Sequence, residues 1–501
     1  MNGMVATLSA DHDPPEDARV DILDTAEAGP SVIRGSLLRL SAYLLGTLAT
    51  LASSAVVIRH LGVVDTGRFI TVTAIVTIVA TISDLGLTSI AVREYAARPR
   101  PEGRRFLRNL LGVRVVFALG GLLVAVLFGL VIGYPSVMVV GIVIAGLGMV
   151  GVVLQDGVSI PLQVGLRFGW VSGLQLAIQV GAAIEAVLLV VAGAGLVPFF
   201  ALQLPVVLPV LAVTAVVGGH DARLLPSFDT QEWRRMVGRI LPYSATVVLA
   251  VVYFQIAQVM VSLLSSPTET GYFGVAFRVL VSCTLLPGLV MSPALPLLAR
   301  AARDDAARFD YASRRLAETM LLSGCGCALA LFLGARFAVD VVAGPGFGHS
   351  VEVLRILAVA LLGTFVTGGR GYALLSLDRL RAMLVSNGIA LIVVVACGVP
   401  LISADGATGA AIAMLAAELT LAVGYEWSLS RSRPAVRFGL RFVLKAATAA
   451  LIAAAVTTAL GVPSVVAAAL GLALYVALVL ALGIVPVEVR QALRDRRRPG
   501  A

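Results

Sequence analysis

Long apolar runs separated by short polar loops recur along most of the chain. Each run is close to the roughly twenty residues that an α-helix needs to cross a bilayer, and none shows the alternation expected of barrel strands. The pattern therefore predicts an all-α polytopic membrane protein. We expect about fourteen transmembrane helices, at roughly 36–58, 69–91, 109–132, 136–160, 170–193, 197–217, 243–264, 272–297, 317–338, 352–376, 381–402, 407–429, 442–460 and 464–485.

A short polar motif occurs twice at the same place in this pattern. The first copy, after the first apolar run, is Asp65-Thr66-Gly67-Arg68-Phe69, and the second, 204 positions later, is Glu269-Thr270-Gly271-Tyr272-Phe273. We interpret both as turns of helical hairpins. Because six crossings separate the copies, the two six-helix halves should be parallel, and transporters built in this way bind substrate between their halves.

The repeat and the loops divide the chain into six parts. We expect an acidic disordered cytoplasmic tail at 1–33, an N-lobe of six helices at 34–217, a cytoplasmic linker at 218–239, a C-lobe of six helices at 240–430, two appended helices at 431–485 and a basic cytoplasmic tail at 486–501. The appended helices have no counterpart in the first half.

Composition and charge agree with a membrane protein. With 59% hydrophobic and 13% charged residues and a mean hydropathy of +0.97, the chain is too apolar for a soluble protein. Of its 38 Lys and Arg residues, 28 fall in loops on the side of the N-terminus or in the C-terminal tail. This bias predicts that both termini are cytoplasmic. It also explains the net charge of +9 without nucleic acid, although contact of these loops with lipid headgroups is an alternative.

The residues that common enzyme sites require are missing from the sequence. Lys445 is the only lysine and no phosphate-binding glycine motif precedes it, and the four histidines do not have the spacing of a zinc site. The four cysteines lie within apolar runs, where we expect them to pack as small residues. We therefore predict a protein that is not an enzyme and needs neither a cofactor nor a metal ion.

Ionisable side chains within the predicted helices are candidates for function, because each costs about 2.5–3.5 kcal/mol at mid-membrane depth. Asp84 should form a structural ion pair with either Arg114 or Arg93. Glu185 and Glu418 are the deepest acids, and they are candidates for ion coupling or, alternatively, for protonated hydrogen-bond partners of neighbouring helices.

Arginines near the predicted gap between the lobes are candidates for binding an anionic substrate, because guanidinium pairs bidentately with phosphate oxygens. Arg278 is the first of these, in a helix that should border the gap. Arg39, Arg355 and Arg370 follow, although each lies near the end of a helix and can extend toward the membrane surface instead.

Five segments together resemble the polysaccharide-flippase branch of the MOP (multidrug/oligosaccharidyl-lipid/polysaccharide) exporter superfamily over about residues 34–485. They are LGVVDTGRF, DLGLTSIAVREYA, PLQVGLRFGWVSGLQ, VYFQIAQVMVSLLSSPTETGYFGVAFRVL and VEVLRILAVALLG. The resemblance implies a MATE-like fold with a central cavity that opens alternately to each side. It also implies that cavity arginines, here Arg278 and Arg39, meet the diphosphate of the substrate.

The function that follows is transport of a polyprenyl-diphosphate-linked oligosaccharide from the inner to the outer leaflet of a bacterial cell membrane, for surface polysaccharide assembly. Besides this lipid-linked oligosaccharide and membrane lipids, a polysaccharide polymerase and glycosyltransferases are expected partners, and nucleic acid is not. Three alternatives stay open: a multidrug or cation antiporter, a peptidoglycan-precursor flippase, and a membrane scaffold without transport.

Overall fold

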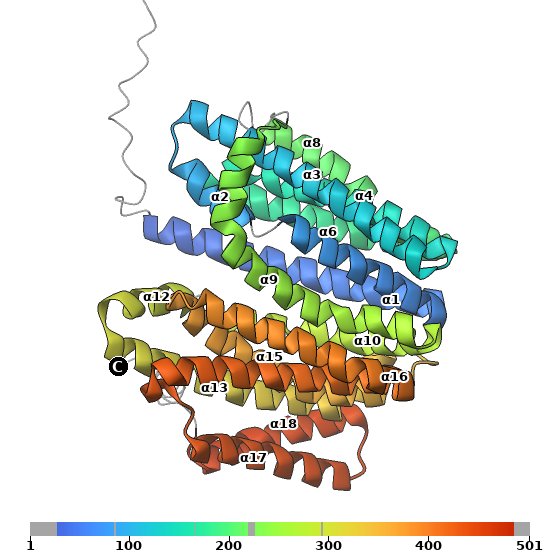
Figure 1. Cartoon of the computed structure of the whole chain (residues 1–501). Helices are drawn as coiled ribbons and strands as arrows, with labels where there is room; N and C mark the ends of the chain where they lie inside the picture. Colours follow the sequence, from blue (N-terminus) through green and yellow to red (C-terminus); the bar gives the residue numbers. More distant parts are fainter. Residues whose placement is uncertain (1–27, 85–86, 166, 219–225, 292–293, 485–501) are drawn as a thin grey trace, which may run out of the picture.

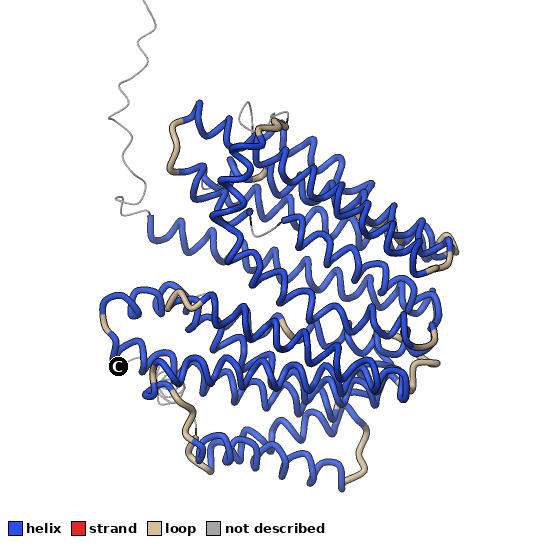
Figure 2. Tube along the Cα trace, in the orientation of Figure 1, coloured by secondary structure: helices blue, strands red, loops and turns tan. Residues whose placement is uncertain are grey.

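The structure is a computed structural model that describes residues 28–84, 87–165, 167–218, 226–291 and 294–484. The predicted basic tail at 486–501, most of the predicted acidic tail and part of the linker lie outside the described residues. Within the described ranges, every regular element is a helix. The prediction of an all-α fold is confirmed, as the tube in Figure 2 shows.

The first half of the chain forms one helical lobe, the N-lobe, drawn from blue to green in Figure 1. Its helices are α1 (Ala28–Asp84), α2 (Leu87–Ala96), α3 (Arg100–Ile132), α4 (Ser136–Val158), α5 (Ile160–Val164), α6 (Phe168–Val191), α7 (Leu196–Phe199) and α8 (Leu204–Val217).

The second half forms the C-lobe, which lies beside the N-lobe (Figure 1). Its helices are α9 (Thr230–Leu264), α10 (Pro267–Cys283), α11 (Leu285–Met291), α12 (Ala294–Asp304), α13 (Ala306–Leu333), α14 (Ala335–Val342), α15 (Ser350–Ser376) and α16 (Leu380–Ser432). A short 3₁₀ helix, η4 (Pro434–Val436), leads to α17 (Leu440–Ala459) and α18 (Ser464–Ala481). These last two helices pack on α13 of the C-lobe.

Twelve helices among the described residues are long and apolar enough to cross a membrane. Two of them, Leu44–Asp84 and Leu380–Ser432, are far longer than a bilayer requires: a helix of about forty residues would extend about 60 Å, twice the hydrocarbon thickness. Each is broken, the first at Gly62 and the second at Asp405 and Gly406. Counting each broken helix as two crossings gives the fourteen that hydropathy predicts.

The helical hairpins turn just before the repeated polar motifs, and not within them as we expected. The first turn is at Gly62, which has a φ of 71°. In the second copy α10 begins after Ser266, whose hydroxyl caps the helix by accepting from the Glu269 N–H (3.2 Å). Gly62 turns the chain because glycine adopts positive φ without steric cost. The motifs themselves therefore occupy the first turns of the returning helices.

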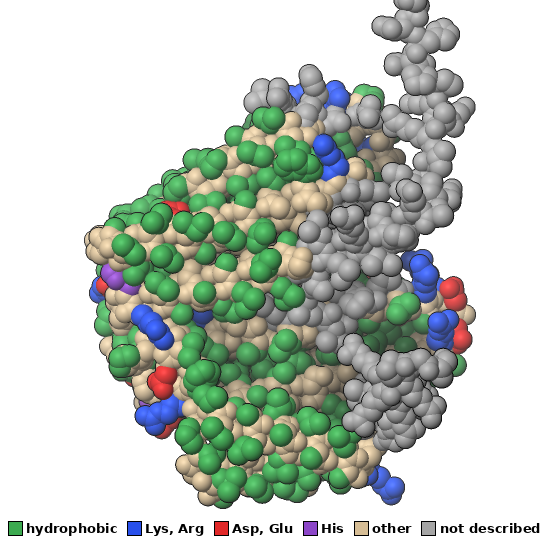
Figure 3. All heavy atoms as spheres, turned by 180° about the vertical axis from the view of Figure 1, so that it is seen from behind, with side chains coloured by type: hydrophobic (Ala, Val, Ile, Leu, Met, Phe, Trp, Pro, Cys, Tyr) green, Lys and Arg blue, Asp and Glu red, His purple; other side chains and the backbone are tan. Residues whose placement is uncertain are grey.

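The two ends of the helix bundle differ in charge, and the band between them is apolar. We call the end that carries the loops 93–108, 300–315 and 431–445 the basic end, and the end that carries Gly62 and Gly406 the hairpin end. In Figure 3 hydrophobic side chains cover most of the band between these ends, while charged side chains gather toward the edges. Side chains as large as Val131 (84%) and Leu451 (70%) are exposed there. Such a continuous apolar surface fits lipid and not water.

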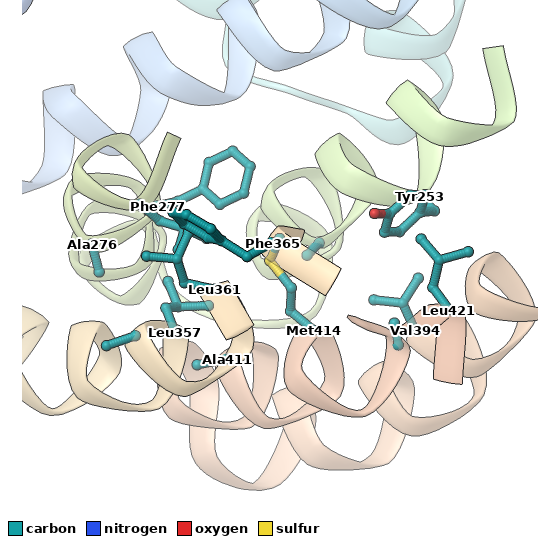
Figure 4. Close-up of a cluster of buried hydrophobic side chains, with 14 of the residues drawn as sticks. Tyr253, Ala276, Phe277, Leu357, Leu361, Phe365, Val394, Ala411, Met414 and Leu421 are labelled. Atoms are coloured by element: carbon teal, nitrogen blue, oxygen red, sulfur yellow. The ribbon is translucent and has the colours of Figure 1, made fainter. Parts of the chain in front are cut away.

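The C-lobe contains the largest hydrophobic core. Figure 4 shows Phe277 of α10 beside Phe365 of α15, with Met414 of α16 below and Tyr253 reaching in from α9. The rings of Phe273 and Phe277 stack at 5.7 Å. This packing fixes α10 against the C-lobe, and it leaves the opposite face of α10 toward the N-lobe.

Candidate functional site at the seam between the lobes

The lobes meet where the two copies of the repeated motif face each other. A Cβ atom on Gly67 of α1 would lie 2.7 Å from the Pro267 carbonyl oxygen of α10, and a Cβ on Gly271 would collide with the Val63 carbonyl. Because Gly67 and Gly271, like Val63 and Pro267, are 204 positions apart, these contacts are reciprocal. The repeat therefore forms a pseudo-twofold contact, and at these two positions only glycine leaves room for the helices to approach so closely.

We call this contact between α1 and α10 the seam. Arg278 lies further along it, toward the basic end. A Cβ on Gly274 would contact Ile70 of α1, and Arg278 follows Gly274 by four residues, so it lies on the same face of α10. Its repeat counterpart on α1 is the small, buried Ala74. The Arg278 side chain is half-buried, and no acidic side chain among the described residues forms an ion pair with it. A half-buried cation without a counter-ion is a candidate site for an anion.

Several contacts join the lobes at the hairpin end. Arg59 Nη2 of α1 donates to the carbonyl oxygens of Asp340 (2.9 Å) and Val341 (2.5 Å), the last turn of α14. The Tyr134 hydroxyl, between α3 and α4, lies 2.7 Å from Ser262 Oγ of α9. The seam is thus fastened at the hairpin end, and a cation on the C-terminus of α14 suits the partial negative charge of that helix end.

Glu418 is fully buried in the C-lobe. Its Oε1 accepts from the Tyr253 hydroxyl (2.9 Å), while its Oε2 and the nearby Thr364 Oγ1 are buried without a hydrogen-bond partner. A buried carboxylate without a cation is costly, so this geometry favours a protonated carboxyl group. Both alternatives for Glu418, ion coupling and hydrogen bonding between helices, are compatible with these contacts.

Glu185 lies in α6 and is half-buried. Its Oε2 atom is buried without a hydrogen-bond partner, and the neighbouring Ala186 packs with Val57 of α1 and Phe199 of α7. Glu185 is therefore on the N-lobe, away from the Tyr253–Glu418 pair. Ion coupling through Glu185 stays a prediction.

Arg114 is fully buried and forms an ion pair with Asp84, with 2.6 Å between Nη2 and Oδ1. Its Nη1 also donates to the Val153 carbonyl (3.3 Å), so Arg114 joins α1, α3 and α4 near the basic end. Of the two partners expected for Asp84, the structure brings Arg114 to it. The side chain of Arg93 lies outside the described residues.

Two of the other predicted arginines, Arg370 and Arg355, do not lie with Arg278. Arg370 is fully buried, 2.6 Å from Glu426 Oε2, and it donates to the Val436 carbonyl (3.0 Å), so it anchors η4 to the C-lobe. Arg355 is exposed at the hairpin end of α15, with its guanidinium 5.7 Å from the Phe332 ring centroid. The side chain of Arg39 lies outside the described residues. Substrate contact for these three stays a prediction.

A cavity of about 500 Å³ lies at the basic end of the N-lobe, between α2, α3 and α9. Ion pairs cross it, including Arg105–Asp229 (3.4 Å). The Glu232 and Gln231 backbone N–H groups, together with Arg105, hold the pKa of Asp229 below its ordinary value. These contacts fix the start of α9 on the N-lobe, although its later turns pack on α16. Helix α9 therefore links the two lobes.

Gln258, which no sequence motif singled out, is fully buried in α9 at the seam. Its Nε2 is 3.4 Å from Thr71 Oγ1 of α1 and from the Thr270 carbonyl of α10. The sequence shows only that Gln258 lies in the seventh apolar run, and no motif distinguishes it from the other residues of that run. A signal did exist for Ala74, because subtracting the repeat offset of 204 from Arg278 gives its position.

The described residues contain no group of three or more His, Cys, Asp or Glu side chains that could hold a metal ion. What the described part of the seam contains is a cation without an ion pair, buried polar groups and a pair of lobes joined at one end. This combination fits transport of a polar solute across a bilayer.

Solved structures with the same fold are transporters. The chain matches a lipid II flippase, MurJ, in an inward closed conformation with a TM-score of 0.74 and 14% identity, over 92% of this chain and 100% of that one. It also matches an inward-facing multidrug resistance MATE family transporter of the MOP superfamily (TM-score 0.62, 14% identity, 80% and 98% covered). A third match is a MOP superfamily transporter from Pyrococcus furiosus (0.55, 15%, 81% and 96%). The fold is thus that of the MurJ and MATE transporters.

Within this class, the sequence identifies the family. The profile described as "Polysaccharide biosynthesis protein" matches residues 56–352, which is more than half of the chain. The protein therefore belongs to this family of polysaccharide biosynthesis proteins, and the resemblance noted from the sequence motifs is confirmed. The search of curated proteins returned no match.

Proposed function

We propose that the protein is a flippase that moves a polyprenyl-diphosphate-linked oligosaccharide from the inner to the outer leaflet for cell-surface polysaccharide assembly. The family and the fold support a transporter of this kind. The observation that carries the choice of substrate is Arg278, a half-buried cation on the seam face of α10 without an ion-pair partner among the described residues. A diphosphate is the anion that a guanidinium binds well.

The orientation follows from charge. The basic end carries most of the loop arginines, so the positive-inside rule assigns it to the cytoplasm of a bacterial cell, with both termini on that side. The contacts of Arg59, Tyr134 and the Gly67–Gly271 pair then close the side away from the cytoplasm. The headgroup enters from the cytoplasmic leaflet, and breaking these contacts releases it on the other side, while the prenyl chain stays in lipid.

We propose that Glu418 couples this transport cycle to the movement of a proton. Its buried oxygen without a partner is a place where a proton can be held or released when α9 moves Tyr253. Replacement of Glu418 by Gln mimics the protonated form. We expect E418Q to keep substrate binding and to lose the dependence of transport on a proton gradient.

The test of the function is the replacement Arg278→Ala in a cell whose surface polysaccharide depends on this protein. We expect loss of surface polysaccharide at an unchanged protein level, and partial recovery with Arg278→Lys, which keeps the charge but not the bidentate geometry. The matched control is Arg441→Ala, which removes an exposed arginine on α17, away from the seam. Normal polysaccharide in R278A cells would contradict the proposed diphosphate contact.

A specific observation also keeps a second candidate, a peptidoglycan-precursor flippase, because the lipid II flippase fold covers nearly the whole chain. Depletion of the protein in the same cells separates the two functions. Depletion of a peptidoglycan-precursor flippase causes lysis, whereas depletion of the proposed protein removes surface polysaccharide from intact cells. If the protein is a multidrug antiporter, its depletion will instead change drug resistance.

A further inference from the structure

The two walls of the seam are not equivalent, although they are copies of one module. At equivalent positions, α10 carries Arg278 where α1 carries Ala74, and Val281 where α1 carries Thr77. A second hydroxyl on α1, Thr81, follows one turn further toward the basic end. The cation therefore lies on the C-lobe wall, and the hydroxyl groups lie on the N-lobe wall.

The hydroxyl groups of α1 present hydrogen-bond acceptors and not donors. Thr77 Oγ1 donates to the Thr73 carbonyl (2.7 Å), and Thr81 Oγ1 donates to the Thr77 carbonyl (2.9 Å). Each hydroxyl hydrogen is thus used within the helix, and the oxygen lone pairs remain available. Thr77 is exposed although it lies in a membrane-spanning helix. Both side chains lie toward the α10 side of α1, which Gly67 and Ile70 define through their contacts with α10.

Gln258 gives an independent indication of a ligand with donor groups. Its Nε2 is directed to Thr71 and Thr270, while its Oε1 is buried without a partner and faces Gly274, one helical turn from Arg278. A fully buried acceptor without a donor is unfavourable unless a bound molecule or water supplies one. Three oxygen acceptors thus lie along the same seam as Arg278.

Building on the proposed function, we propose that Thr77, Thr81 and Gln258 form a sugar-binding strip that accepts hydrogen bonds from the hydroxyl groups of the oligosaccharide, while Arg278 binds the diphosphate. The division follows from chemistry. A diphosphate has only acceptor atoms at neutral pH, so it gains nothing from acceptor oxygens, whereas each sugar residue carries several hydroxyl donors. The strip therefore recognises the glycan part of the substrate and not its lipid or phosphate.

The test compares two fluorescent probes that share one polyprenyl diphosphate, one carrying a hexose trisaccharide and the other a methyl ester. Binding is measured on the purified full chain in lipid nanodiscs. The variant is Thr77→Val with Thr81→Val, which keeps the side-chain shape and removes the acceptors. Two lost hydrogen bonds should weaken binding of the trisaccharide probe about fivefold to 150-fold and leave binding of the methyl ester probe unchanged.

The matched control replaces Thr448 and Thr458 by Val. Both are exposed threonines of α17 that donate to carbonyls of their own helix in the same way (2.8 Å each), and they lie away from the seam. This control should bind both probes like the unmodified chain.

Two outcomes overturn the inference: unchanged trisaccharide binding in the Thr77/Thr81 variant, or an equal loss for both probes. Failure of the proposed function looks different, because the unmodified chain would then bind neither probe, or R278A would bind both probes normally. Loss of both probes in R278A, with selective loss of the trisaccharide probe in the threonine variant, supports both proposals.

Discussion

Arg59 should control how firmly the lobes are closed at the hairpin end. Its guanidinium joins α1 of the N-lobe to the last turn of α14 in the C-lobe through two carbonyl oxygens. The replacement Arg59→Ala removes both hydrogen bonds and the favourable charge at the C-terminus of α14. It leaves the glycine contact between Gly67 and Gly271 intact, so we expect a shift between conformations and not unfolding.

The size of the effect follows from the exposure of Arg59. Hydrogen bonds to a charged group contribute about 1.5–3 kcal/mol when they are shielded from water. Arg59 is exposed, and exposed charged pairs contribute about 0.2–1 kcal/mol. We therefore expect a change of about 1 kcal/mol, which alters the ratio of open to closed conformations about fivefold.

The measurement is a distance distribution between spin labels on the two lobes. Cysteines at Val131 and Phe337, both exposed at the hairpin end, carry the labels in a chain whose four native cysteines are replaced. The control is Arg68→Ala, because Arg68 pairs with Asp65 in its own helix (2.9 Å) and joins no lobes. A distribution for R59A that matches the one for R68A would refute the reasoning.

Three further predictions concern stability and the packing of the lobes. Replacing buried Arg114 by Leu should lower the free energy of unfolding by about 3 kcal/mol, because it removes the ion pair with Asp84; thermal denaturation in detergent measures this loss, which the additional change Asp84→Asn should partly restore. Gly271→Ala should separate the lobes, whereas Gly120→Ala, with nothing within 4 Å of the new Cβ, should not, and the label distances above distinguish them. The lowered pKa of Asp229 means that its charge stabilises the start of α9 above the unfolded-state pKa of about 3.9. This contribution is lost as the pH falls through the lower folded-state pKa, so the melting temperatures of wild type and Asp229→Asn should converge on acidification.

The number of crossings and the repeat could be predicted from sequence because both are one-dimensional properties. Apolar length alone gives fourteen spans, and an offset of 204 relates Gly67 to Gly271. The turn could also have been placed better: Gly62 ends an apolar run, where a left-handed glycine commonly ends a helix. We placed the turn in the polar motif that follows, because polar residues are also typical of turns.

The sequence does not reveal which charged side chains form ion pairs or hydrogen bonds. Arg278 and Arg370 both lie within apolar runs, yet Arg370 is paired with Glu426 on another helix, while no described acid pairs with Arg278. The difference depends on which helices pack together, and spacing along the chain does not specify this. The same holds for Glu418, whose partner Tyr253 is 165 positions away.

The differences between the two copies make the two walls of the seam chemically different. At Gly67 and Gly271 the copies are alike, and the contact between them is reciprocal, as a pivot between two rocking lobes requires. Two helical turns away the likeness ends, since Ala74 faces the side on which Arg278 lies. A symmetric cation pair at this level would repel itself in low dielectric. A single arginine opposite alanine avoids this repulsion, leaves space for a headgroup, and lets one lobe bind the phosphate while the other contacts the sugar. We therefore expect Ala74→Arg to impair transport as severely as Arg278→Ala, although it adds a charge and removes none; unimpaired transport by A74R would show that the asymmetry of the seam has no functional role.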